Sequence, residues 1–153
     1  MQIKELELIQ ELAEGNNIIY CDASGIQHIL VALFINAIDA MSKGGKLKVK
    51  TILLDKSQEI QIVISDTGSG IPEEILPHIF EPFVSTKEST GLGLAVVYGI
   101  IQQHKGEIEV DSDPNQGTTF TITLPRRPAR DQSEDRVVIT SALKSDLKEK
   151  EDG

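Results

Sequence analysis

Residues 66–72, which read Asp-Thr-Gly-Ser-Gly-Ile-Pro, combine an acid and two glycines in the manner of a ligand-binding turn. Isoleucine occupies every second position of 60–64, a pattern that predicts a strand with one apolar face. Asp66 has the parity of these isoleucines, so we expect a core-facing carboxylate that needs partners, because uncompensated desolvation is costly. Gly68 and Gly70 allow a tight turn and close approach of a ligand. An ordinary turn after a strand is the alternative.

Asn36 is a second candidate, and it lies in the clearest helical pattern of the chain, residues 25–42. Apolar residues recur there at three- and four-residue steps, which is typical of a helix with one buried face. On the helical wheel Asn36 falls beside Ile29 and Ala40, at the edge of the buried stripe. Its amide either bonds a neighbouring loop or points an oxygen ligand for Mg²⁺ into a pocket.

A third candidate is the glycine-led run from Gly91 to Leu94, which opens a second predicted helix. The unpaired amides and the positive dipole end of such a helix start together form an anion site. Simple close packing also explains glycines at this position.

Thr118 is a fourth candidate, because it shares the parity of the apolar residues within 120–124 and should face inward. A threonine on an apolar face is often a tolerated core residue. Equally, Thr118 can complete the polar wall of a pocket that holds Asp66.

The helices and strands predicted from the sequence must hold the four candidate sites together, and residues 78–90 are expected to stay irregular. The pattern predicts a short helix at 3–14, strands at 17–21, 46–54 and 60–66, a helical turn at 73–76, and a hairpin of strands 107–111 and 118–124. Residues 78–90 hold two of the four phenylalanines. Within them, 85–90 are small and polar, as expected of a mobile flap.

Length and charge restrict the class of protein. The 153 residues predict one domain at 1–125 and a charged, disordered tail at 126–153. The net charge of −9 lies entirely in 1–125, and an acidic domain without a basic stripe is a poor candidate for nucleic-acid binding. The single Cys21 fits a reducing compartment. A signal peptide is not expected, because the start of the chain is charged throughout. A membrane-spanning run is not expected either, since the longest apolar stretch, Ile29–Ile38, is too short.

Four motifs in order resemble those of the ATP-binding catalytic domain of sensor histidine kinases, whose fold gyrase, heat-shock chaperone and mismatch-repair ATPases share. The motifs are Asn36-Ala37 (N box), Asp66, Gly68 and Gly70 (first glycine box), Phe80 to Phe83 (F box) and residues 90–95, TGLGLA (second glycine box). The four motifs together make the resemblance specific, and it covers about residues 5–125.

The resemblance implies an α+β fold, a two-layer α/β sandwich of the Bergerat type. In it a mixed, mostly antiparallel sheet carries helices on one face, and ATP lies between the helices and the flap. Asp66 would accept a hydrogen bond from the adenine amine, Thr118 would support that contact through water, and Asn36 would hold Mg²⁺. The full set of implied nucleotide-binding residues is Asn36, Asp66, Gly68, Gly70, Ile71, Lys87, Gly91, Leu92, Gly93, Leu94 and Thr118.

The reaction implied is that of a protein-histidine kinase, which binds Mg-ATP and transfers the γ-phosphoryl group to a histidine in two-component signalling. The three histidines of the chain lie in segments assigned to the nucleotide domain. We therefore expect the acceptor histidine on a helical dimerisation domain outside this chain, docked through Phe80–Phe83 and the flap. A response regulator would be an indirect partner, and the expected location is the cytoplasm, without nucleic-acid or membrane contact.

One departure from the family pattern bears on the alternatives. Ala32, one turn before Asn36, stands where the hydrolytic relatives carry a glutamate general base. Efficient ATP hydrolysis is therefore not expected. A hydrolytic ATPase of the same superfamily is one alternative function, and a non-catalytic nucleotide-binding or anti-sigma-like interaction module is another.

Overall fold

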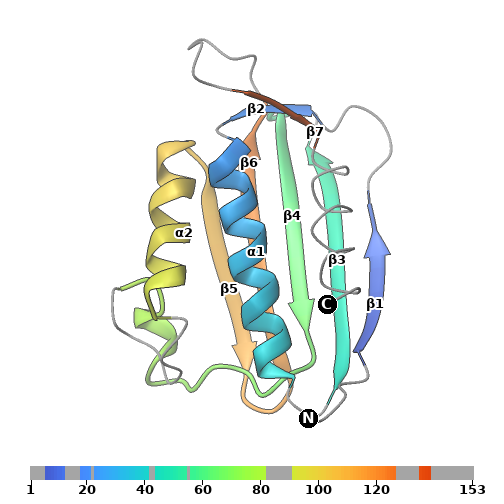
Figure 1. Cartoon of the computed structure of the whole chain (residues 1–153), viewed down its shortest axis with the longest axis vertical. Coiled ribbons are helices and arrows are strands. Elements are labelled where there is room, and N and C mark those ends of the chain that lie inside the picture. The colour runs from blue at the N-terminus through green and yellow to red at the C-terminus, as the bar shows by residue number, and fades with distance from the viewer. Residues whose placement is uncertain are drawn as a thin grey trace.

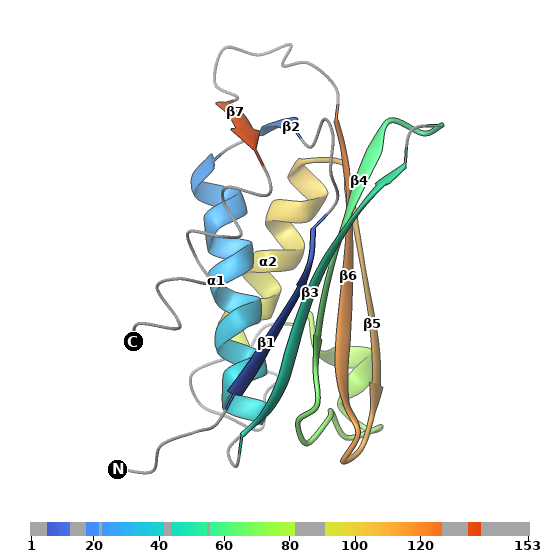
Figure 2. The same ribbon diagram turned by 90° about the vertical axis from the view of Figure 1, so that its right-hand side faces the viewer.

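A five-stranded sheet, with both helices packed on the same face, forms the body of the computed structural model (Figure 1). The structure describes residues 6–12, 18–21, 23–41, 44–54, 56–81, 91–126 and 135–138. The strand order is β1-β3-β4-β6-β5. The strands are β1 (Leu6–Glu11), β3 (Gly45–Leu54), β4 (Glu59–Asp66), β5 (Glu107–Asp113) and β6 (Gly117–Pro125). The edge-on view separates the sheet from the helical layer (Figure 2).

The sheet is mixed and mostly antiparallel. β1 pairs parallel with β3, whereas β3–β4, β4–β6 and β5–β6 are antiparallel pairs. The two predicted hairpins, β3–β4 and β5–β6, are confirmed. The expected two-layer α/β sandwich is confirmed as well, because α1 (Ala23–Ala40) and α2 (Gly91–Gln103) cover one face only.

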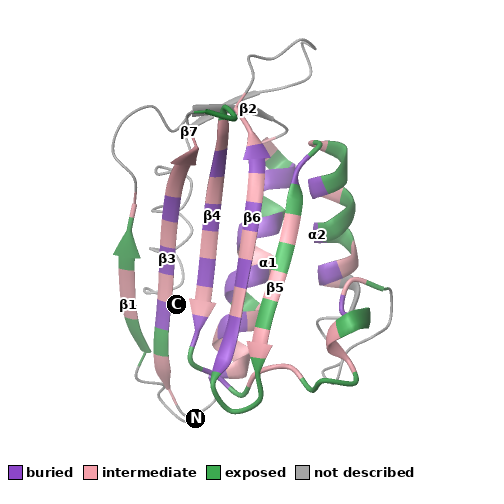
Figure 3. Cartoon of the chain, turned by 180° about the vertical axis from the view of Figure 1, so that it is seen from behind, coloured by how far each residue is buried: buried purple, intermediate pink, exposed green. Residues whose placement is uncertain are grey.

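The core lies between the two layers. Phe34 of α1 and Ile101 of α2 are fully buried, and they belong to one cluster with Ile62, Ile64 and Ile122 of the central strands. Buried and partly buried residues alternate along β4 and β6, which Figure 3 shows from the uncovered side of the sheet, so the buried residues point toward the helices. This alternation positions Asp66, the last residue of β4, on the helix-facing side.

Helix α1 is apolar enough to cross a membrane by length and composition alone, with a mean hydropathy of 1.4 over 18 residues. Seven of its residues are nevertheless buried within the domain, in the stripe that the sequence predicted. The stripe identifies α1 as the core helix of the sandwich, because a buried helix in a folded domain passes the same test.

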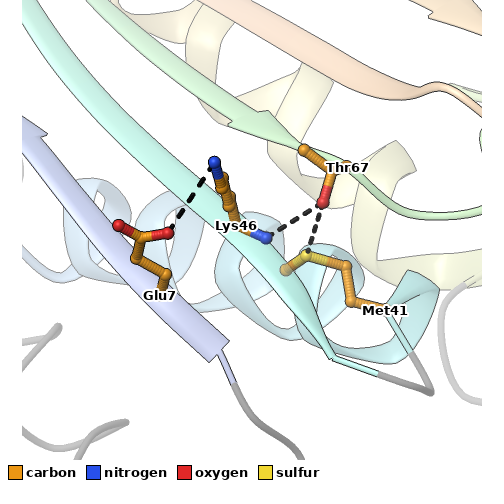
Figure 4. Close-up of polar contacts among 4 residues, drawn as sticks. All are labelled: Glu7, Met41, Lys46 and Thr67. Carbon is orange, nitrogen blue, oxygen red and sulfur yellow. Dashed lines mark hydrogen bonds and ion pairs between the residues drawn. The ribbon is translucent and has the colours of Figure 1, made fainter.

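The prediction of a helix at 3–14 is wrong, because residues 6–11 form strand β1. Leu6, Leu8 and Leu12 share one parity and so fit a strand as well, and a short isolated helix is only marginally stable. The edge of β3 offers backbone hydrogen bonds that a strand can use. Register then sets Glu7 opposite Lys46, and their side chains form an ion pair at 3.9 Å (Figure 4). This pair is exposed, so it contributes little to stability.

A separate two-stranded sheet lies near the N-terminal end of α1 (Figures 1 and 2). It pairs β2 (Ile18–Cys21), the strand expected at 17–21, antiparallel with β7 (Asp135–Val138). β7 falls within the predicted tail, so at least these four residues have a paired backbone. The domain boundary at 125 stays a prediction, because residues 127–134 and 139–153 lie outside the described part of the chain.

Candidate functional site

Asp66 is buried at the end of β4, with 8% of its surface exposed. Its Oδ1 accepts a hydrogen bond from the Gly68 backbone N–H at 2.8 Å and another from the Thr118 backbone N–H at 3.3 Å. Backbone donors of this kind compensate a carboxylate for lost water. The expected inward orientation of Asp66 is confirmed, and Thr118, itself 5% exposed, lies directly beside it.

Ser112 of β5 was not among the predicted site residues, yet it joins three parts of this site. Its Oγ accepts a hydrogen bond from the Ile71 backbone N–H at 2.8 Å, lies 2.9 Å from Thr118 Oγ1 and lies 3.2 Å from the Gly117 carbonyl oxygen. The sequence does contain a signal for Ser112, because this residue continues the helix-facing parity of the two apolar residues of β5. A polar residue with core parity near a strand end was therefore detectable.

The turn after Asp66 is wedged between the end of α1 and the β5–β6 hairpin. A β-carbon at Gly68 would lie 2.5 Å from the Ala40 carbonyl oxygen, the group to which the Ser69 N–H donates at 3.0 Å. Gly70 has φ of +76°, and its β-carbon would lie 2.3 Å from the Asp113 carbonyl oxygen. Both positions exclude a side chain, so the turn is held in one conformation by backbone contacts.

Thr67 fixes the same turn to β3. Its Oγ1 accepts a hydrogen bond from the Lys46 backbone N–H at 2.9 Å and lies 3.9 Å from the sulfur of Met41 (Figure 4). Met41 is 1% exposed and follows the last turn of α1. Thr67 thereby joins the turn to β3 and to the end of α1.

Asn36 and Gly93 line a cavity of about 440 Å³ on the outer side of α1. The cavity is lined by Ser24, Gln27, His28, Val31, Ala32, Ile35, Asn36 and Gly93. Asn36 is partly buried, at the edge of the α1 stripe as expected. Asp66 and Thr118 are not part of the lining. The cavity thus brings the predicted metal ligand together with Gly93 of the predicted anion site, while Asp66 lies in a polar cluster outside the lining.

The predicted glycine-led helix start is confirmed, since α2 begins at Gly91. Leu94 is buried with 9% exposed, whereas a β-carbon at Gly93 would meet no atom within 4 Å. Close packing against described residues therefore does not explain the glycine at position 93. Lys87 lies outside the described residues, as does Phe83.

Phe80 is the described member of the aromatic pair at 80–83, and it stacks on Tyr98 of α2. The two ring centroids are 5.4 Å apart with an interplanar angle of 28°. This contact joins the segment after η1 (Leu76–His78) to the helix that carries the glycine-led start.

Within the described residues, no group of three or more His, Cys, Asp or Glu side chains could hold a metal ion. Asn36 offers one amide oxygen, and Mg²⁺ that is bound by one or two protein ligands relies on substrate phosphates for the others. The donor set therefore fits a metal that arrives with a polyphosphate.

Residues 21–128 match the protein family described as histidine kinase-, DNA gyrase B-, and HSP90-like ATPase, and the chain belongs to this family. Sporulation kinase A of Bacillus subtilis is 39% identical over 107 residues, which are 69% of this chain and 17% of that protein. The chain thus spans about a sixth of the length of this relative.

Solved structures point to the same class within the family. The catalytic domain of histidine kinase ThkA has a TM-score of 0.70 at 30% identity, with 79% of each chain covered. Full-length ShkA in complex with AMPPNP has a TM-score of 0.71 at 26% identity, over 81% of this chain and 26% of that one. The resemblance to the ATP-binding catalytic domains of sensor histidine kinases is confirmed.

Proposed function

We propose that this domain binds Mg-ATP and transfers the γ-phosphoryl group to a histidine of a helical partner domain in two-component signalling. The observation that carries the proposal is the buried carboxylate of Asp66, held by backbone donors beside Thr118 at the end of the sheet. A buried carboxylate is a hydrogen-bond acceptor, and it suits the amine of adenine, which donates. The proposal rests also on membership of a family of ATPases.

In this proposal Asp66 accepts a hydrogen bond from the adenine amine, and Thr118 supports it. The turn residues Gly68, Gly70 and Ile71 would contact the base, and the close backbone contacts at both glycines hold the turn in place for it. The amides of Gly91, Leu92, Gly93 and Leu94 meet the phosphates at the start of α2, together with Lys87.

Asn36 is the residue of this chain that would hold Mg²⁺, and bound Mg²⁺ would neutralise charge on the phosphates. The protein residues themselves act by positioning. They orient the nucleotide so that its γ-phosphoryl group faces the acceptor imidazole, whose nitrogen forms the new bond to phosphorus while ADP leaves. The acceptor domain would dock through Phe80–Phe83, and a response regulator would receive the phosphoryl group next. In this proposal the reaction takes place in the cytoplasm, where ATP is available.

Titration calorimetry with Mg-ADP tests the binding part. Asp66→Asn is expected to raise the Kd about tenfold or more, which is the usual size of a hydrogen bond to a charged group. Asp111→Asn removes the same charge from an exposed position of β5 and should leave the Kd unchanged. Absence of ADP binding by folded protein would overturn the proposal.

Radiolabelled ATP tests the transfer part. The domain is mixed with the helical histidine domain of a related kinase, and the partner should acquire phosphate that is labile in acid and stable in alkali, as an N–P bond is. Phosphate that is stable in acid would instead indicate a serine or threonine acceptor.

A further inference from the structure

Ser112 carries a hydroxyl that contacts both the turn after Asp66 and the side chain of Thr118. Its Oγ lies within 2.8 Å of the Ile71 N, 2.9 Å of Thr118 Oγ1 and 3.2 Å of the Gly117 carbonyl oxygen. The three partners come from the turn and from β6, whereas Ser112 itself comes from β5. Ser112 therefore reaches the candidate site without being one of its predicted ligand contacts.

One arrangement of hydrogen atoms satisfies all three contacts of this cluster, as a count of donors and acceptors shows. A serine hydroxyl has one donor and two acceptor positions. The Ile71 N–H can only donate, so it takes one lone pair of Ser112, and a hydrogen bond to the Gly117 carbonyl at 3.2 Å uses the Ser112 proton. Either oxygen can donate across the 2.9 Å Ser112–Thr118 contact, but all three contacts are hydrogen bonds at once only when Thr118 donates its hydroxyl proton to Ser112.

The assignment leaves Thr118 Oγ1 with lone pairs alone for any other partner. Asp66, whose Oδ1 accepts the Thr118 backbone N–H at 3.3 Å, is also an acceptor. The site would thus present acceptors to a ligand, which suits a purine with an amine at C6. A purine with an oxygen at C6 would be disfavoured, because that oxygen would face the acceptor oxygens of Asp66 and Thr118 without a proton between them.

We propose that Ser112 is a specificity-determining positioning residue, which selects 6-aminopurine over 6-oxopurine nucleotides by holding the Thr118 hydroxyl as an acceptor. The inference rests on the proposed function, since it concerns the base edge of the same nucleotide site. Ser112 acts through Thr118 and does not itself touch the ligand.

The test compares ADP with inosine diphosphate, which carries oxygen in place of the 6-amino group and a proton on N1. Calorimetry gives the ratio of the Kd for inosine diphosphate to the Kd for ADP. In Ser112→Ala the Thr118 hydroxyl is released and can donate to the oxygen, so the ratio should fall roughly five- to tenfold, the size of one neutral hydrogen bond.

The ratio separates this role from a structural one. Ser112→Ala also removes the acceptor of the Ile71 N–H, and a loosened turn would weaken both nucleotides together and leave the ratio unchanged. Ser65→Ala is the matched control, because Ser65 Oγ forms the same kind of bond with Thr119 Oγ1, at 2.7 Å, on the opposite face of the sheet. Its ratio should equal that of the wild type.

A Thr118→Val background gives the second arm, because a valine has no hydroxyl for Ser112 to orient. In this background, Ser112→Ala should leave the ratio of the two Kd values unchanged. The double-mutant cycle then isolates the coupling between Ser112 and Thr118. The inference is overturned if Ser112→Ala keeps the Kd ratio of the wild type. It is also overturned if Ser112→Ala changes the ratio as much in the Thr118→Val background as in the wild type. If the wild type binds neither nucleotide, the proposed function has failed instead.

Discussion

A β-carbon at Gly117 would lie 2.0 Å from the carbonyl oxygen of Asp66. The two strands that carry the acid and Thr118 are therefore in backbone contact at the site, and Gly117 has a φ of +114° that side chains rarely adopt. This contact brings the Thr118 N–H, one residue later, within 3.3 Å of Asp66 Oδ1. The polar cluster depends on the absence of a side chain at this position.

Gly117→Ala should therefore lower the free energy of unfolding by about 2 kcal/mol or more, from backbone strain and overpacking. Urea denaturation followed by circular dichroism measures it. Gly99→Ala is the control, because a β-carbon there meets no atom within 4 Å, and it should stabilise α2 by about 0.5–1 kcal/mol. Equal stability of the two variants would contradict the close approach at Gly117.

Asn36→Ala should weaken ADP binding only when Mg²⁺ is present, by about tenfold, since one oxygen ligand is removed. Calorimetry in Mg²⁺ and in EDTA separates the two conditions. Gln27→Ala changes a residue that lines the other part of the same cavity, and it should leave both Kd values unchanged. An equal loss of affinity in EDTA would show that Asn36 acts without the metal.

The wild-type domain should hydrolyse ATP slowly, because Ala32, which lines the cavity one turn before Asn36, has no base to activate water. Ala32→Glu should raise steady-state turnover at least about tenfold, toward the 10²- to 10⁴-fold that a positioned general base contributes. Phosphate release in a coupled assay measures this rate. Ala32→Gln, which has the same shape but no base, should show no rise; a fast wild type would favour the hydrolytic alternative.

Tyr98→Ala should lower the free energy of unfolding by about 1 kcal/mol through loss of the stack on Phe80. Tyr98→Phe keeps both rings and should retain wild-type stability in the same urea experiment. Val96→Ala is a useful comparison, because Val96 is 44% exposed on the same helix and Tyr98 is 43% exposed. A loss in Val96→Ala as large as that in Tyr98→Ala would mean that the ring contact is not responsible.

Local periodicity was enough to predict most of the fold and the inward carboxylate. The two-residue period of β4 specifies which face is buried, so the burial of Asp66 follows from the isoleucines before it. The three- and four-residue steps of α1 similarly place Asn36 at the edge of the buried stripe. Each of these two properties belongs to one element, β4 or α1, and does not depend on the element that packs against it.

Tertiary structure alone decided the features that depend on contacts between distant segments. Residues 6–11 became a strand because the edge of β3 was open to them, and no local pattern contains that edge. Ser112 reaches Thr118 and Ile71 only through the register of β5 on β6 and the path of the turn after Asp66. The sequence by itself therefore determined which side chains face inward. The register of the strands and the path of the turn determined which of these side chains meet, because pairing across the sheet sets the distances between them.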